Sequence, residues 1–152
     1  MKNLITTLLI LLSLFIVSCG ETIDSKSLVE RDGLIYKINS QTPFNGKSIS
    51  YLDNGQIGYE VNYKDGEFDG KWVWYYDNGQ IKTKRNYKDG KIDGKSISYF
   101  KNGQINKEVN YKDGKEDGKW TSYNEDGFIQ KEVNFKDGEQ DGWKEYIYYE
   151  NG

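Results

Sequence analysis

The chain of 152 residues contains no histidine, one cysteine and one proline, and each shortage excludes a class of protein or site. Without histidine there is neither a Ser–His or Cys–His catalytic pair nor a metal site that uses imidazole. The single cysteine, Cys19, leaves no intrachain disulfide, so the cysteine count says nothing about redox compartment. Catalysis and metal binding of these kinds are therefore excluded.

The charges are numerous but mixed in sign. Removing a leader that contains Lys2 leaves 20 basic side chains against 24 acidic ones, a net charge of −4. A nucleic-acid-binding protein usually presents a concentrated basic face. The composition therefore predicts no nucleic-acid partner.

Residues 1–18 have the pattern of a signal peptide. The apolar run from Leu4 to Val17 follows Lys2 and is too short to span a bilayer with its own margins. Ile16-Val17-Ser18-Cys19 resembles the lipobox of bacterial lipoproteins. The resemblance implies cleavage before Cys19 and a diacylglycerol on its thiol. The alternatives are an ordinary signal peptide with a chance cysteine and a buried core thiol.

Lipidation predicts an exported protein, anchored to the cell membrane or outer membrane and facing the periplasm or cell surface. Glu21 stands at the second position after Cys19, where aspartate commonly marks inner-membrane retention. In a two-membrane cell this favours the outer membrane. Residues 19–27 are polar and aperiodic, which predicts a tether.

A 24-residue period organises the rest of the chain. Glycines recur at this spacing in three series: Gly46, Gly70, Gly94, Gly118 and Gly142; Gly55, Gly79, Gly103 and Gly127; Gly66, Gly90, Gly114 and Gly138. Short runs rich in β-branched and aromatic residues lie between them, which predicts two strands and two turns in each unit. The predicted fold is all-β, an elongated single-layer antiparallel meander of tandem β-hairpins stabilised by contacts between neighbouring units.

The turn type sets which side chains share a face. A three-residue loop at Asp53-Asn54-Gly55 pairs Tyr51 with Ile57 and Ile49 with Tyr59, which collects tyrosine, isoleucine and valine on one face. The opposite face is then polar in most units. Large aromatic residues interrupt it in unit two and later units: Trp72, Trp74, Tyr76, Phe100 and Trp120.

Both ends of the array are irregular. Residues 28–45 predict a divergent cap hairpin centred on Asp32-Gly33, and residues 46–152 form the array. In the last unit Trp143 is an insertion after Gly142, and only a first strand, Lys144 to Tyr149, precedes Gly152. This incomplete repeat predicts a longer array, or strand-edge pairing with a partner or a second copy; a frayed terminal strand is the alternative.

The segment Gly70 to Ile81, followed by Asn86 to Gly90, resembles the bacterial MORN-repeat variant. Arg31 to Tyr36 and Thr42 to Gly46 are similar to the N-terminal cap of that family, so the resemblance covers about residues 28–152. Members are often labelled YwqK-type antitoxins of toxin–antitoxin systems. The resemblance implies protein contacts, dimerisation or phospholipid binding, and it brings no catalytic residues. A weaker resemblance to choline- or cell-wall-binding repeats implies glycan binding.

Regularly spaced aspartates allow a calcium hypothesis, because carboxylates in glycine-rich loops are oxygen ligands. The pairs are Asp65 and Asp69, Asp89 and Asp93, Asp113 and Asp117, and Asp137 and Asp141. Aspartate before glycine is also the expected turn residue, and we prefer this interpretation. No pair differs from the others as a glycosidase pair would have to. The sequence therefore predicts no metal, cofactor or catalytic residues.

The sequence predicts a cell-envelope lipoprotein that acts as a non-catalytic protein-binding or scaffolding repeat module for an unknown protein partner. The candidate binding face consists of Trp72, Trp74, Tyr76, Phe100 and Trp120, because aromatic side chains anchor protein contacts and stack on sugars. An antitoxin-like inhibitor and a glycan- or cell-wall-binding protein are the alternatives. The same rings could also serve packing alone.

Overall fold

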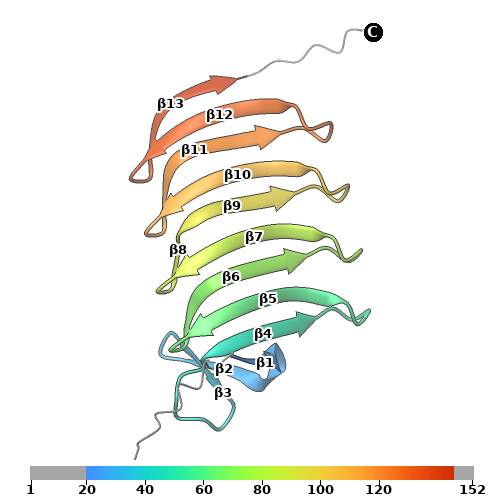
Figure 1. Ribbon diagram of the computed structural model, residues 1–152, viewed down its shortest axis with the longest axis vertical. Helices are drawn as coiled ribbons and strands as arrows, with labels where there is room; N and C mark the ends of the chain where they lie inside the picture. Colours follow the sequence, from blue (N-terminus) through green and yellow to red (C-terminus); the bar gives the residue numbers. More distant parts are fainter. Residues whose placement is uncertain (1–19, 146–152) are drawn as a thin grey trace, which may run out of the picture.

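The structure is a computed structural model that describes residues 20–145. Its main feature is an 11-stranded sheet in which hairpins stack along the long axis of the molecule (Figure 1). The strands are β1 (Glu21–Asp24), β4 (Gly46–Tyr51), β5 (Ile57–Lys64), β6 (Glu67–Tyr75), β7 (Ile81–Lys88), β8 (Lys91–Ile92), β9 (Gly94–Tyr99), β10 (Ile105–Lys112), β11 (Lys115–Tyr123), β12 (Ile129–Lys136) and β13 (Glu139–Glu145). This architecture confirms the predicted all-β meander.

We number the repeats as unit one (residues 46–69), unit two (70–93), unit three (94–117) and unit four (118–141). The first turns of the units lie in a row at one end of the strands, and the second turns lie in a row at the opposite end (Figure 1). The predicted leader, Cys19 and the end of the last repeat after residue 145 lie outside the described residues.

The N-terminal segment corrects the prediction of a tether over residues 19–27. Strand β1 pairs with β4 in parallel, with Glu21 opposite Gly46, and a 3-10 turn, η1 (Ser25–Ser27), follows it. Residue 20 lies so close to the sheet that a Cβ there would be 2.8 Å from the Cα of Gly46. Polarity suggested a linker, but β1 satisfies the backbone groups on the open edge of β4, which outweighs side-chain composition.

A cap hairpin docks on the first unit. Strands β2 (Leu28–Arg31) and β3 (Leu34–Lys37) form a separate two-stranded sheet around the turn at Asp32-Gly33, as predicted. The N–H of Ile35 donates to the carbonyl of Gly66 at 2.9 Å, and the N–H of Gly66 donates to the carbonyl of Phe44 at 3.0 Å. Phe44 is buried. These contacts join the cap to the second turn of unit one.

The predicted three-residue loop is confirmed, but the face assignment derived from it is wrong. The N–H of Leu52 donates to Gln56 and the N–H of Gly55 donates to Leu52, both at 2.8 Å, and Tyr51 lies opposite Ile57. A bulge follows at Gly58, so that Tyr59 lies opposite Ser50 rather than Ile49. One extra residue reverses the side-chain alternation beyond the bulge.

The bulge recurs in every unit and creates two faces. We call one of them the valine face, after its buried side chains: Ser48, Val61, Ser96, Val109 and Val133. Trp72, Trp120 and Trp143 lie opposite these valines across the strands and are on the same face, as is Arg85, which lies opposite Trp72. The lysine face carries Lys47, Lys71, Lys95 and Lys119 together with Ile49, Glu60, Val73, Lys84, Ile97, Glu108, Thr121 and Glu132. Trp72 and Trp120 therefore share a face with the core valines, contrary to the prediction.

The second turns explain the recurring Asp-Gly and Asn. In unit one, Asp65 and Gly66 have φ angles of 51° and 83°, which make a two-residue turn that suits a twisted hairpin. Three residues, Asp69 to Lys71, then lie opposite the single residue Asn62. The amide of Asn62 donates to the carbonyl of Lys71 at 2.9 Å, and Asn110 donates to Lys119 in the same way. The asparagine thus compensates for the interrupted pairing.

The interruption in strand pairing after the second turn is one residue shorter between β12 and β13 than between β5 and β6. Trp143 lies opposite Val133, as Trp72 lies opposite Val61 and Trp120 opposite Val109. In β13 only Asp141 and Gly142 separate Gln140, which lies opposite Phe135, from Trp143. Trp143 therefore occupies the regular tryptophan position, and the insertion predicted after Gly142 is wrong within β13.

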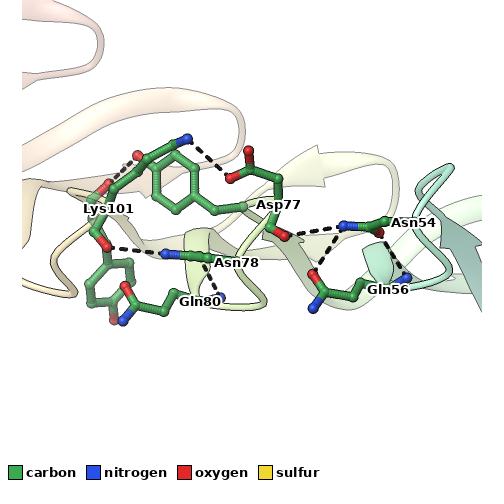
Figure 2. Close-up of polar contacts among 8 residues, drawn as sticks. Asn54, Gln56, Asp77, Asn78, Gln80 and Lys101 are labelled. Carbon is green, nitrogen blue, oxygen red and sulfur yellow. Dashed lines mark hydrogen bonds and ion pairs between the residues drawn. The ribbon is translucent and has the colours of Figure 1, made fainter.

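Neighbouring units contact each other along both rows of turns. At the second turns, the N–H of Gly90 donates to Phe68 and that of Gly114 donates to Ile92, one unit earlier. At the first turns, the amide of Asn54 donates to the carbonyl of Asp77, and Asn78 donates to Lys101 (Figure 2). Each unit is therefore held to the next at both ends, as a linear repeat array requires.

Candidate binding site

An aromatic cluster lies on the valine face of unit two. Trp72 and Trp74 project from β6 with ring centroids 5.7 Å apart and an interplanar angle of 66°. The ammonium of Lys82 lies 4.6 Å from the Trp74 ring centroid and 5.7 Å from that of Tyr76. The guanidinium of Arg85 lies 5.1 Å from the Trp72 ring. Each contact has the geometry of a cation–π interaction.

Comparison with the other units shows how unusual this cluster is within the array. Units one and three carry the identical segment Gly-Lys-Ser-Ile-Ser-Tyr at residues 46–51 and 94–99, whereas unit two has Gly-Lys-Trp-Val-Trp-Tyr. Trp72 replaces a serine that is fully buried in unit one, and Trp74 is 42% exposed. Unit two therefore adds aromatic surface that the fold of its neighbours does not need.

The structure divides the predicted binding face. Trp72 contacts Trp74, and Lys82 lies over both Trp74 and Tyr76. Trp120 lies four strands farther along the sheet, at β11. At the usual strand spacing this is roughly 19 Å. The Tyr76 hydroxyl donates to the carbonyl of Tyr99 at 2.7 Å. Among the ring contacts of residues 20–145, none joins Phe100 to this cluster.

Two basic residues of unit two, one on each face of the sheet, escaped the sequence prediction. Units one, three and four have Glu-Val at residues 60–61, 108–109 and 132–133, whereas unit two has Lys84-Arg85. Arg85 thus replaces a buried valine and lies over Trp72. Aligning the units by their period would have revealed this exchange of an acidic and an apolar residue for two basic ones.

The regular aspartates serve the turns. The N–H of Asp113 donates to the Asp93 carboxylate at 3.3 Å, and the N–H of Asp137 donates to Asp117 at the same distance. A hydrogen bond from Lys136 to Asp117 lowers the pKa of that carboxyl. These carboxylates join the second turns of neighbouring units. Within residues 20–145, no group of three or more His, Cys, Asp or Glu side chains is placed to hold a metal ion.

A row of rings along the second turns supports packing and adjoins the tryptophan cluster, because the Trp72 and Tyr87 ring centroids are 6.5 Å apart. The ring centroid of Tyr63 lies 5.8 Å from that of Phe44 and 5.2 Å from that of Phe68. The ring centroids of Phe68 and Tyr87 are also 5.2 Å apart. Burial, with smaller contributions from Tyr59 and Glu30, raises the pKa of Tyr63 to about 12. The phenol is therefore held neutral as part of the contact between the cap, unit one and unit two.

The 24-residue hairpins, their stacking and their interlocked turns define a tandem β-hairpin repeat protein. The MORN repeat variant matches four successive segments, residues 44–65, 68–89, 92–113 and 116–137, which together make up more than half of the chain. The chain therefore belongs to the MORN repeat variant family. MORN repeats are commonly modules that bind proteins or membranes.

The comparison with curated proteins returned no match. In residues 20–145 no helix is long and apolar enough to cross a membrane. The family assignment therefore rests on the four matched repeats.

Proposed function

We propose that the protein is a non-catalytic protein-binding or scaffolding module in which unit two makes the principal contact. The observation that carries this proposal is Trp74, which is 42% exposed at a position where units one and three have serine. Tryptophan contributes more to protein interfaces than most residues because a rigid ring buries a large area at small entropic cost. An extra exposed ring in one unit therefore favours a binding role over packing.

A protein partner accounts for the cluster better than a sugar does. The ammonium of Lys82 lies over Trp74 and the guanidinium of Arg85 lies over Trp72, so one face of each ring is already covered by a cation. Sugar binding by stacking requires free ring faces, whereas a protein interface can combine ring edges, basic groups and hydrogen bonds. An antitoxin-like inhibitor would be one form of such a protein-binding module.

The proposed location is the cell envelope, through a diacylglycerol on Cys19. Gly20, the next residue, packs beside Gly46, and β1 begins at Glu21. An acyl anchor would therefore hold the β1 end of the array close to the membrane surface. We expect Cys19→Ser to abolish palmitate labelling and membrane retention. Unchanged labelling and fractionation would refute the lipoprotein assignment.

The binding proposal is tested by giving unit two the sequence of its neighbours. A triple substitution, Trp72→Ser, Val73→Ile and Trp74→Ser, makes residues 70–75 identical to the segments in units one and three. Photo-crosslinking in the native envelope should then yield at least about tenfold less partner adduct. Trp120→Ser in unit four is the matched control and should retain the adduct. Equal adduct from the triple variant and the wild type would refute a role for this cluster.

A further inference from the structure

The lysine face carries a cross-strand ion pair in three of its four units. Lys47 Nζ lies 2.8 Å from Glu60 Oε2, and Lys95 Nζ lies 3.0 Å from Glu108 Oε1. Lys119 pairs with Glu132 in the same way. The lysine follows the first glycine of the unit, and the glutamate comes from the next strand. A carboxylate is therefore the group that these lysines bind within the array.

Unit two lacks this carboxylate. Lys84 occupies the position of Glu60 and Glu108, so Lys71 has a second lysine where the other units have glutamate. Within residues 20–145, no carboxylate lies within ion-pair distance of Lys71 or Lys84. Both side chains are exposed. The Lys84 ammonium lies 5.7 Å from the Tyr99 ring centroid. The lysine face of unit two therefore has two positive charges without a carboxylate partner among the described residues.

A pocket of ≈ 350 Å³ lies among these lysines. Its lining combines basic and apolar side chains: Lys71, Lys84, Lys95, Val73, Ile81 and Ile97. The corresponding hollow in unit four, of ≈ 400 Å³, is lined by Lys119 and by its own ion-pair partner Glu132. Unit two thus has the same kind of hollow without its internal carboxylate.

We propose that this pocket binds an acidic segment of a protein partner, with a Glu or Asp carboxylate between Lys71 and Lys84. The ion pairs of units one, three and four show the interaction that a carboxylate makes at this position. An apolar side chain beside the carboxylate would cover Val73, Ile81 and Ile97, which a free inorganic anion would leave in water. Charge complementarity adds specificity and accelerates association.

This inference rests on the proposed protein-binding function and names the chemistry of the partner. It places a second contact on the sheet face opposite the tryptophans, between unit two and the first strand of unit three. Arg85 adjoins both contacts, but the tryptophans and Lys84 can be changed separately. Val73→Ile, which accompanies the tryptophan changes, keeps the pocket wall apolar.

The test uses the full chain and a fluorescein-labelled peptide of alternating Glu and Leu, measured by fluorescence anisotropy. Lys84→Glu restores the residue of the other three units and should form an ion pair with Lys71 while preserving the fold. We expect it to weaken binding by about tenfold. Lys88→Glu, an equal charge change outside the pocket, should alter binding by no more than about twofold. A peptide with Gln in place of Glu should bind poorly.

Three outcomes would overturn the inference. The Gln peptide could bind as tightly as the Glu peptide, or Lys84→Glu could leave the affinity unchanged. Vesicles of phosphatidylglycerol and phosphatidylcholine could bind through Lys84 while the peptide does not, which would identify a lipid site instead.

The Trp72→Ser, Val73→Ile, Trp74→Ser variant separates this inference from the proposed function. It should still bind the peptide, because the lysines remain. If the peptide does not bind but crosslinking depends on the tryptophans, the inference fails and the proposed function stands. If peptide binding depends on Lys84 but crosslinking is unaffected by the tryptophan changes, the aromatic contact fails and the pocket stands.

Discussion

The docking of the cap on unit one predicts different effects for the same substitution at two equivalent glycines. Gly66 and Gly90 both follow aspartate in a second turn, with φ angles of 83° and 75°. At Gly66 a Cβ would lie 3.0 Å from the Ile35 carbonyl oxygen, whereas at Gly90 its nearest neighbour is the flexible Glu67 side chain at 3.7 Å. Alanine would therefore strain the backbone at both positions, but it would make a close contact with the cap only at Gly66.

The expected losses of stability follow from these contacts. Alanine in the left-handed region costs about 1 kcal/mol, which we expect for Gly90→Ala. At Gly66 the Cβ would also displace the cap and weaken the hydrogen bonds from Ile35 to Gly66 and from Gly66 to Phe44. Each contributes about 1 kcal/mol, so Gly66→Ala should cost about 3 kcal/mol.

Urea unfolding of the two variants, followed by tryptophan fluorescence, measures this difference directly. Gly66→Ala should lose about 2 kcal/mol more than Gly90→Ala, the difference expected from two hydrogen bonds. Equal losses, within about 0.5 kcal/mol, would refute the docking of the cap on this turn.

Three further predictions concern individual side chains. Because the pKa of Tyr63 is raised from 10.0 to about 12, its phenol loses the proton at lower pH in the unfolded chain than in the folded one. The free energy of unfolding should therefore fall as pH rises through this range, and urea titrations at several pH values should show a smaller fall in Tyr63→Phe. Val109→Ala should destabilise by about 2 kcal/mol in urea unfolding, whereas Val29→Ala, at a 39% exposed position, should change stability little; similar losses would contradict the buried row of valines. Asn110→Ala should cost about 1 kcal/mol in the same assay by removing its bond to the Lys119 carbonyl, and no loss would show that this bond is unimportant.

The repeat, the hairpins and the three-residue loop could be predicted because each depends on local residue types at a fixed period. The faces could not, because the bulge at Gly58 reverses the alternation and no residue type marks it: Lys82, Asn106 and Gln130 hold the same position in later units. Residue patterns in a strand report faces only while pairing is regular. This is why Trp72 was assigned to the face opposite Val61.

The N-terminal strand and the basic pocket depend on non-local information. Strand β1 is short and polar, and it forms because β4 offers an open edge. The pocket depends on Lys71 and Lys84, which are brought together by the pairing of β6 with β7. The tryptophan cluster was found from the sequence because the residue types themselves are conspicuous, although Trp120 does not join it.

The central claim, that unit two is the binding unit, is tested most directly by converting it to its neighbours' sequence on both faces. The variant combines Trp72→Ser, Val73→Ile and Trp74→Ser with Lys84→Glu and Arg85→Val, all residues that other units carry at the same positions. Quantitative crosslinking mass spectrometry in the native envelope should show wild-type adducts on unit two, and at least about a tenfold loss in the variant at unchanged circular dichroism. Adducts of equal yield from the folded variant, or adducts confined to other units, would contradict the account.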